Sequence, residues 1–244
     1  MDKWVKTLNT FSFVGIRGPY SERMLKEAGF DNCTITGDTA LALARTEFKT
    51  LVEKDAARGT ANKVIGFNYG LIKNSQLWGD AATYTHNIVQ LIKELINEGY
   101  SIKLLPVWDK DIASNRELLR LVDDSRCTMK LAFGTLADYQ RELDGCHLFI
   151  GQKLHATIMA TMERIPSIMI EYNPKCRDYM ASVSMEHCVI RTSDCQPENV
   201  LKSVTYLEKN YGAVQDILDE RIMHYRTLQF KTARRIEDEL LKLP

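Results

Sequence analysis

Apolar runs and helical patterns alternate along most of the chain. Short apolar runs that end at a glycine or a polar residue are typical of buried parallel strands, and the clearest span 64–68, 102–107, 148–150 and 167–170. Between and after them, apolar residues recur at helical spacing in 81–97, 112–122, 136–143 and 197–209. This alternation predicts an α/β fold, in which a Rossmann-like parallel sheet carries helices on both faces.

The strand–helix–strand unit at residues 148–175 carries the first candidate chemistry. Gly151, Lys153 and His155 fall where the strand 148–150 gives way to a helix. Ligands of such folds bind beyond the carboxyl ends of the strands, and a helix start offers unpaired N–H groups and partial positive charge. Lys153 adds a cation, and His155 adds a group that exchanges protons near neutral pH. The junction suits an anionic substrate that must be protonated; the alternatives are a solvated Lys153 and a structural His155.

Two further polar residues follow predicted strands near the N-terminus. Arg17 comes after the apolar run 11–16, and Asp38 comes after the run 33–36. Both therefore occupy the same kind of place as His155, just beyond a strand. The structural alternatives are a loop salt bridge for Arg17 and a helix N-cap before residues 40–45 for Asp38. The sequence favours function for Arg17 and the N-cap for Asp38.

Other segments are assigned from their caps and charges. Ser21 is a candidate N-cap for a helix that runs to residue 28, with Gly29 in the usual C-terminal position. The charged, weakly patterned stretch 46–62 predicts a connection between a first piece and the main domain. The tail 214–243 predicts one or two long amphipathic helices.

Charge and composition narrow the functional classes. Thirty-two Lys and Arg balance 32 Asp and Glu, so no broad attraction to nucleic acid or an anionic membrane is predicted. The six cysteines form no CxxC pair and no zinc-ligand spacing, which favours free thiols in a reducing compartment. The N-terminus lacks a signal-peptide pattern, and no apolar run approaches the roughly 20 residues that span a bilayer. The sequence thus predicts a soluble cytoplasmic protein without a transmembrane segment.

Common phosphate, metal and esterase motifs are missing from the sequence. GxxxxGK[ST], GxGxxG, HExxH and GxSxG do not occur. Their absence disfavours a nucleoside triphosphatase, a standard dinucleotide fold, a zinc hydrolase and an esterase. We expect neither a metal site nor a resident cofactor.

Three short sequence segments are informative as an ordered set. They are RGPYS at 17–21, TGDTAL at 36–41 and GQKLHA at 151–156, the last leading into Ile165-Pro166 and YNPK at 172–175. Together, over about residues 14–181, they resemble the polysaccharide pyruvyl transferase family. The resemblance implies transfer of a pyruvyl group from phosphoenolpyruvate to two hydroxyls of a sugar, as a cyclic ketal, in surface polysaccharide biosynthesis. It also implies a two-domain, GT-B-like architecture with the site in the interdomain cleft.

The resemblance also implies roles for individual residues. Phosphoenolpyruvate carries a carboxylate and a phosphate, so Arg17, Lys153 and Lys175 are candidate cations for it. The helix start behind Gly151 would supply N–H donors, and Asp38 completes the candidate substrate-binding set. His155 is the candidate acid that protonates the methylene carbon of the donor. The expected partners are phosphoenolpyruvate and a glycan acceptor, with no metal. The structural alternative for Lys175 is a solvated cation.

Two departures from the family pattern bear on these expectations. The family usually has Arg-Leu-His where this chain has Lys153-Leu154-His155, and lysine keeps the charge but lacks the bidentate fork of arginine. The arginine motif also comes early in the chain. Residues 1–44 are therefore predicted to be the end of an N-terminal α/β domain, and residues 45–244 a C-terminal Rossmann-like domain with long C-terminal helices.

Two other functions stay open on the sequence. A sugar-nucleotide-dependent glycosyltransferase would share the architecture, because a fold does not fix its chemistry. A non-catalytic, truncated family member that binds glycan or a partner subunit is favoured by Lys153 and by the early arginine motif. The sequence makes no prediction of the oligomeric state.

Overall fold

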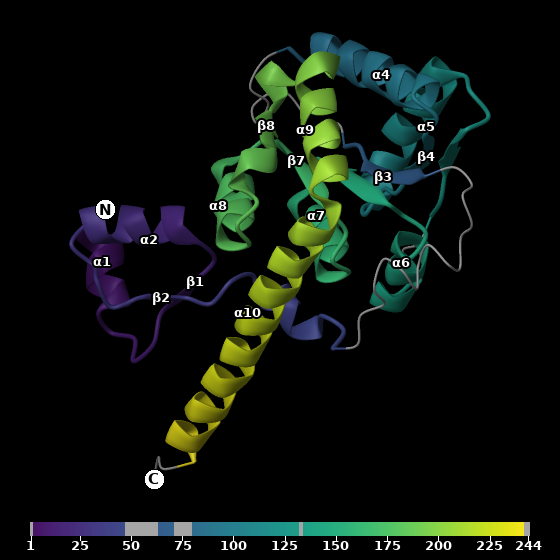
Figure 1. Ribbon diagram of the computed structural model, residues 1–244. Coiled ribbons are helices and arrows are strands. Elements are labelled where there is room, and N and C mark those ends of the chain that lie inside the picture. The colour runs from purple at the N-terminus through teal and green to yellow at the C-terminus, as the bar shows by residue number, and fades with distance from the viewer. Residues whose placement is uncertain (1, 47–62, 71–79, 132–133, 242–244) are drawn as a thin grey trace.

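The computed structural model describes residues 2–46, 63–70, 80–131 and 134–241. Its centre is a six-stranded, fully parallel sheet with the strand order β5-β4-β3-β6-β7-β8 (Figure 1). The strands are β3 (Val64–Asn68), β4 (Ser101–Leu104), β5 (Cys127–Met129), β6 (Leu148–Gly151), β7 (Ser167–Glu171) and β8 (Val189–Arg191). The predicted α/β fold with a Rossmann-like parallel sheet is confirmed.

Helices cover this sheet and bury the apolar stripes that the sequence predicts. They are α4 (Ala81–Asn97), α5 (Ile112–Val122), α6 (Leu136–Leu143), α7 (Leu154–Met162), α8 (Pro174–Ser182) and α9 (Pro197–Lys209). Helix α4 packs against α5 and α9, and its Ile88, Leu91 and Leu95 are fully buried. A smaller apolar cluster, which includes Tyr139 and Phe149, joins α6, α7 and β6. Strands β6 and β7 are buried along their whole length, as strands covered on both faces are.

The chain reverses its direction of travel across the sheet between β3 and β6. From β3 it proceeds outward to β4 and β5, then returns to β6 on the other side of β3 and proceeds to β7 and β8. Strands β3 and β6 are in register, with Asn68 opposite Gly151 at their carboxyl ends. Crevices at such reversal points are where open α/β sheets bind ligands. The GQKLHA segment begins at this point.

The N-terminal elements form a small unit beside the sheet. They are α1 (Asp2–Leu8), β1 (Gly15–Ile16), α2 (Pro19–Glu27), β2 (Thr34–Ile35) and the 3₁₀ helix η1 (Thr39–Leu43). Strands β1 and β2 pair in parallel over two residues each. The predicted strand at 11–16 is therefore wrong over most of its length. With only two residues of β2 to pair with, residues 11–14 form no ladder, and Phe11 is 53% exposed.

The start of α2 is anchored by α8 and not by its own N-cap. Ser21 lies inside the helix, so the predicted Ser21 cap is wrong, and Gly18 occupies the N-cap position. The Asp178 carboxylate accepts hydrogen bonds from the backbone N–H groups of Tyr20 (2.8 Å) and Ser21 (3.2 Å) and from the Ser21 hydroxyl (2.5 Å). A Cβ on Gly18 would lie 2.2 Å from the carbonyl oxygen of Asp178. The RGPYS segment is thus a docking segment for α8.

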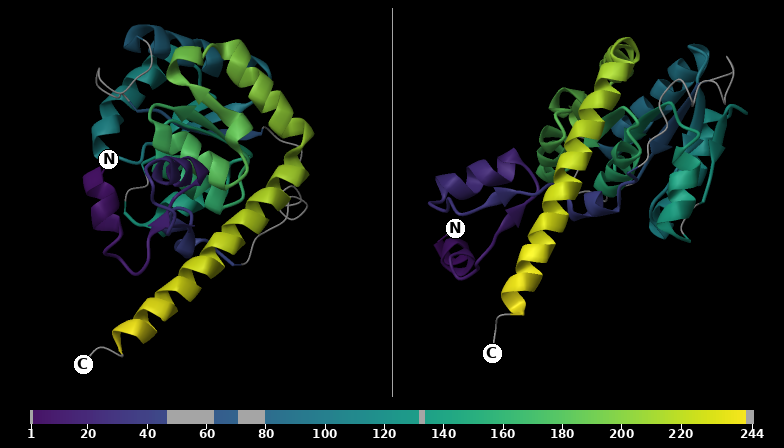
Figure 2. Two further views of the ribbon diagram at one scale, coloured as in Figure 1. Left: turned by 90° about the vertical axis from the view of Figure 1, so that its left-hand side faces the viewer. Right: turned by 60° about the horizontal axis from the view of Figure 1, so that its bottom comes forward.

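Helix α10 (Tyr211–Leu240) ties the N-terminal unit to the sheet from the other end of the chain. It runs from α9 past the sheet toward the C-terminus (Figures 1 and 2). The Gln229 amide donates to the backbone carbonyls of Thr36 and Asp38, both at 2.8 Å, and Arg226 donates to that of Ala44. The predicted tail is one helix.

No helix within the described ranges is long and apolar enough to cross a membrane. The predicted connection at 46–62 falls almost wholly outside the residues that the structure describes.

Removing the Asp178 carboxylate tests the docking of α2. Asp178→Ala leaves two N–H groups at the start of α2 without their acceptor, at a cost of about 2 kcal/mol. We expect hydrogen exchange of the α2 amides to accelerate about 30-fold. Asp216→Ala, which truncates an exposed aspartate of α10, is the matched control. Equal exchange rates in the two variants would contradict the anchoring role.

Candidate active site at the junction of β3 and β6

Side-chain amides bind together the carboxyl ends of the central strands. Asn68, the last residue of β3, donates from Nδ2 to the carbonyl of Leu105 after β4 (2.8 Å) and accepts the backbone N–H of Lys153 after β6 (2.9 Å). Gln152 Oε1 accepts the backbone N–H of Gly70 at 2.8 Å. Because the Asn68 and Gln152 side chains are fully buried, the bonds fix the backbone around the reversal point.

Lys153 extends over this junction. It occupies the N-cap position of α7, and its ammonium lies 3.5 Å from Asp111 Oδ1 and 5.3 Å from the centre of the Trp108 ring. A Cβ on Gly70 would come within 2.4 Å of Lys153 Cε, so the glycine leaves the space through which the side chain passes. The side chain is 17% exposed. The predicted cation is therefore half-enclosed at a helix start, at the place where α/β sheets bind ligands.

Asp111 is a charged residue of this site that the sequence analysis missed. It ends the 3₁₀ turn η2 (Asp109–Asp111) after β4, and its side chain is 3% exposed. Burial raises the pKa of the Asp111 carboxyl, and the Lys153 ammonium opposes that rise. Among the residues that the structure describes, Oδ2 has no hydrogen-bond partner. The sequence signal that could have identified Asp111 as a site residue is its position shortly after the apolar run 102–107.

Gly151 shapes the junction through its lack of a side chain. It is buried at the end of β6, and a Cβ there would lie 2.1 Å from Thr157 Oγ1 and 2.8 Å from the Phe149 ring. Strand and helix thereby approach closely at the first turn of α7. The observed role of Gly151 is this close packing.

His155 and Lys175 are both exposed. His155 is the second residue of α7, and in the described part of the chain no hydrogen bond or ion pair engages its ring. Lys175 is in the first turn of α8, with its ammonium 5.3 Å from the centre of the Tyr172 ring. Both side chains are accessible to a ligand.

Arg17 and Asp38 form an ion pair in the N-terminal unit. Arg17 Nε lies 2.8 Å from Asp38 Oδ2, and Asp38 Oδ1 accepts the backbone N–H of Ala40 at 3.1 Å. The Asp38 carboxylate thus makes both contacts that the structural alternatives expect, the salt bridge and the N-cap of η1. Within the described residues, no hydrogen bond or ion pair joins this pair to Lys153 or His155. The Arg17–Asp38 pair and the segment that carries Lys153 and His155 are connected through η1, which packs against α7.

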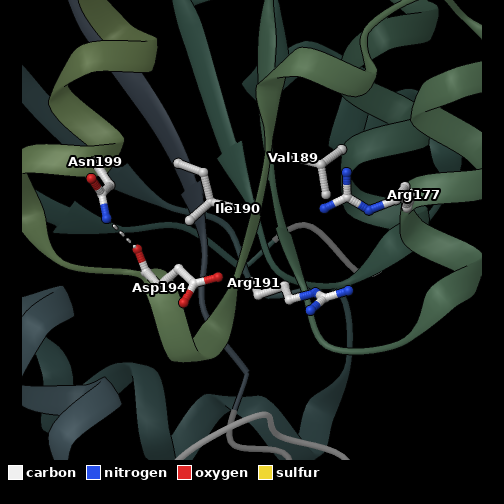
Figure 3. Close-up of a pocket in the computed structure, with 6 residues that line it drawn as sticks. All are labelled: Arg177, Val189, Ile190, Arg191, Asp194 and Asn199. Atoms are coloured by element: carbon white, nitrogen blue, oxygen red, sulfur yellow. Dashed lines mark hydrogen bonds between the residues drawn. The ribbon is translucent and has the colours of Figure 1, made fainter.

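A separate open pocket of about 310 Å³ lies at the carboxyl end of β8. Figure 3 shows its lining residues: Arg177, Val189, Ile190, Arg191, Asp194 and Asn199. Glu171, buried at the end of β7, pairs with Arg177 (3.1 Å) and more loosely with Arg191 (3.6 Å). None of the predicted site residues lines this pocket.

Comparison with solved structures defines the class of fold. A glycosyltransferase from Rickettsia africae superposes over 100% of this chain and 68% of its own, with a TM-score of 0.63 at 8% identity. A putative UDP-N-acetylglucosamine 2-epimerase from Listeria monocytogenes does so over 96% and 61% (TM-score 0.61, 12% identity), and TarM over 98% and 45% (TM-score 0.52, 12% identity). The fold is GT-B-like, and the chain spans 45–68% of the length of these proteins.

Sequence comparison then gives the family. The family model of the polysaccharide pyruvyl transferases matches residues 1–174, and the chain belongs to that family. No curated protein sequence is similar enough to count as a match.

The close packing at Gly151 gives a test of the junction. Gly151→Ala is expected to lower the free energy of unfolding by about 1–3 kcal/mol, because the new methyl group overpacks the first turn of α7. Thr157→Ala in the same chain removes one of the two clashing groups, so a double-mutant cycle by urea denaturation should show partial recovery. Gly212→Ala, in open space on α10, should not destabilise the chain. Additive losses at positions 151 and 157 would contradict the clash.

Proposed function

We propose that this chain transfers a pyruvyl group from phosphoenolpyruvate to two hydroxyls of a glycan, forming a cyclic ketal for a surface polysaccharide. The observation that carries the proposal is the family match over residues 1–174, which includes all three sequence pieces. The position of the third piece supports it, because GQKLHA starts at the reversal point of the sheet.

The donor is assigned to the cations around α7. Phosphoenolpyruvate is strongly anionic, and Lys153 holds a partly exposed ammonium at the positive end of that helix. In this proposal Arg17, kept in place by Asp38, and the exposed Lys175 contribute further positive charge. Gly151 allows β6 and α7 to pack closely, which sets the helix start from which Lys153 extends.

His155 is the proposed acid. In the first step its imidazolium gives a proton to the methylene carbon of phosphoenolpyruvate, and the neighbouring carbon becomes an oxocarbenium-like centre. A sugar hydroxyl attacks that centre and loses its proton. The bond to the phosphate oxygen then breaks, and the second hydroxyl closes the ketal and loses its proton. One hydroxyl proton restores His155, the other leaves with inorganic phosphate, and no additional cofactor takes part.

Phosphate release from phosphoenolpyruvate with a panel of acceptor glycans tests this proposal. We expect release that depends on the acceptor and that falls at least about 100-fold in His155→Ala, the usual contribution of a general acid. His86→Ala replaces an exposed histidine of α4 and should release phosphate at the wild-type rate. Circular dichroism of both variants controls for folding.

The other outcomes separate the competing functions. Turnover of a nucleotide sugar without use of phosphoenolpyruvate would contradict the proposal in favour of a glycosyltransferase. Saturable binding of phosphoenolpyruvate without release would favour the non-catalytic alternative. Full activity of His155→Ala would assign the acid to another residue.

A further inference from the structure

The ion pair of Lys153 and Asp111 leaves its buried carboxylate with few hydrogen bonds. The two groups are separated by 3.5 Å, which is longer than a good charge-assisted hydrogen bond. Asp111 Oδ2 has no hydrogen-bond partner among the described residues, although it is out of reach of water. A buried carboxylate is costly to keep ionised unless its partner and its hydrogen bonds compensate for lost hydration. The ionised state of Asp111 therefore depends on Lys153.

Three hydrogen bonds hold the backbone that carries Asp111, and its side chain is 3% exposed. Asn115 Nδ2 donates to the backbone carbonyl of Asp111 and to that of Tyr69, both at 2.7 Å. The Ser114 hydroxyl donates to the same Asp111 carbonyl at 2.9 Å. These bonds hold the end of η2 against the end of β3. When Lys153 moves toward another anion, the carboxyl group stays behind.

Among the residues that the structure describes, few other charges face Asp111. Helix α7 contributes Lys153, and η2 itself contributes Asp109 and Lys110, of which Asp109 raises the pKa of Asp111 further. The end of β3 and the first turns of α5 contribute the uncharged segment 68–70 and Asn115. Removal of the Lys153 charge thus leaves burial and Asp109 acting in the same direction, toward a protonated carboxyl.

We propose that Asp111 positions Lys153 and takes up a proton when an anion binds to that lysine. The identification of the natural anion as phosphoenolpyruvate rests on the proposed function. The proton enters from solvent, the Lys153–Asp111 contact is exchanged for a Lys153–anion contact, and no covalent bond changes. Anion affinity should consequently rise as the pH falls through the range in which Asp111 is protonated in the complex but ionised in the free chain.

Calorimetric titration with sulfate and with phosphoenolpyruvate tests this inference. Sulfate keeps its charge between about pH 5 and pH 8. Any protons taken up when sulfate binds therefore go to the protein, and titrations in buffers of different ionisation enthalpy count them. The titrations use chains that carry His155→Gln, so that the proposed acid is absent and cannot contribute to the proton count. In that background we expect net proton uptake and weaker binding at higher pH.

Asp111→Asn keeps the size of the side chain and removes its charge. It should bind sulfate about tenfold more tightly at pH 8, because a nearby opposite charge no longer competes for Lys153, and should take up fewer protons. Asp216→Asn makes the same substitution at an exposed position of α10 and should behave as its parent. If Asp111→Asn does not fold, absence of proton uptake by the parent chain overturns the inference by itself.

The outcomes separate this inference from the proposed function. If phosphoenolpyruvate binds and Asp111→Asn changes neither affinity nor proton uptake, the inference fails and the proposed function stands. If sulfate binding depends on Asp111 but no acceptor supports phosphate release, the inference stands and the proposed function fails. If neither anion binds the parent chain, both fail.

Discussion

The bonds of Asn68 are the constraint on which the rest of this site depends. One amide side chain at the end of β3 bonds to the backbone that follows β4 and to the backbone that follows β6. The strands are parallel, but the chain continues from β3 and from β6 toward opposite edges of the sheet. Without these bonds, polar backbone in the crevice between the two connections would be left unpaired, at a cost for each buried group. The same bonds set the start of α7, and thereby the point from which Lys153 reaches over Gly70.

A second constraint holds the N-terminal unit beside that crevice. Asp178 binds the start of α2, and α10 binds the backbone around Asp38. These contacts join residues more than 150 positions apart in the chain. The Arg17–Asp38 pair is thus carried on backbone that α8 and α10 hold in place. This explains why the segments 17–21 and 36–41 belong together structurally. Their glycines serve close approach: a Cβ on Gly37 would meet the Tyr225 ring at 2.8 Å.

The sequence predicted the elements whose signal is local and periodic. The strand at 64–68 and the helices at 81–97, 112–122 and 136–143 have the bounds that the apolar spacing indicates. Prediction from the sequence failed where contacts between residues far apart in the chain determine the local structure. Ser21 has the chemistry of an N-cap, but Asp178 satisfies the start of α2 from another helix, and nothing within residues 17–29 shows this. Asp111 was missed for the same reason, because its burial beside Lys153 follows from strand order.

A lysine at position 153 forms a weaker pair with the neighbouring Asp111 carboxylate than an arginine would. A guanidinium would offer Asp111 two parallel hydrogen bonds and would form a strong, directional pair. The ammonium is a point charge on a flexible stem, and it faces one oxygen of Asp111 at 3.5 Å. That weaker contact is easier to exchange for a contact with a bound anion. A fixed carboxyl group that loses its partner then has a neutral, protonated state available to it. In this chain the loss of the arginine fork and the poorly satisfied ion pair therefore belong to one arrangement, in which the cation moves and the carboxylate stays.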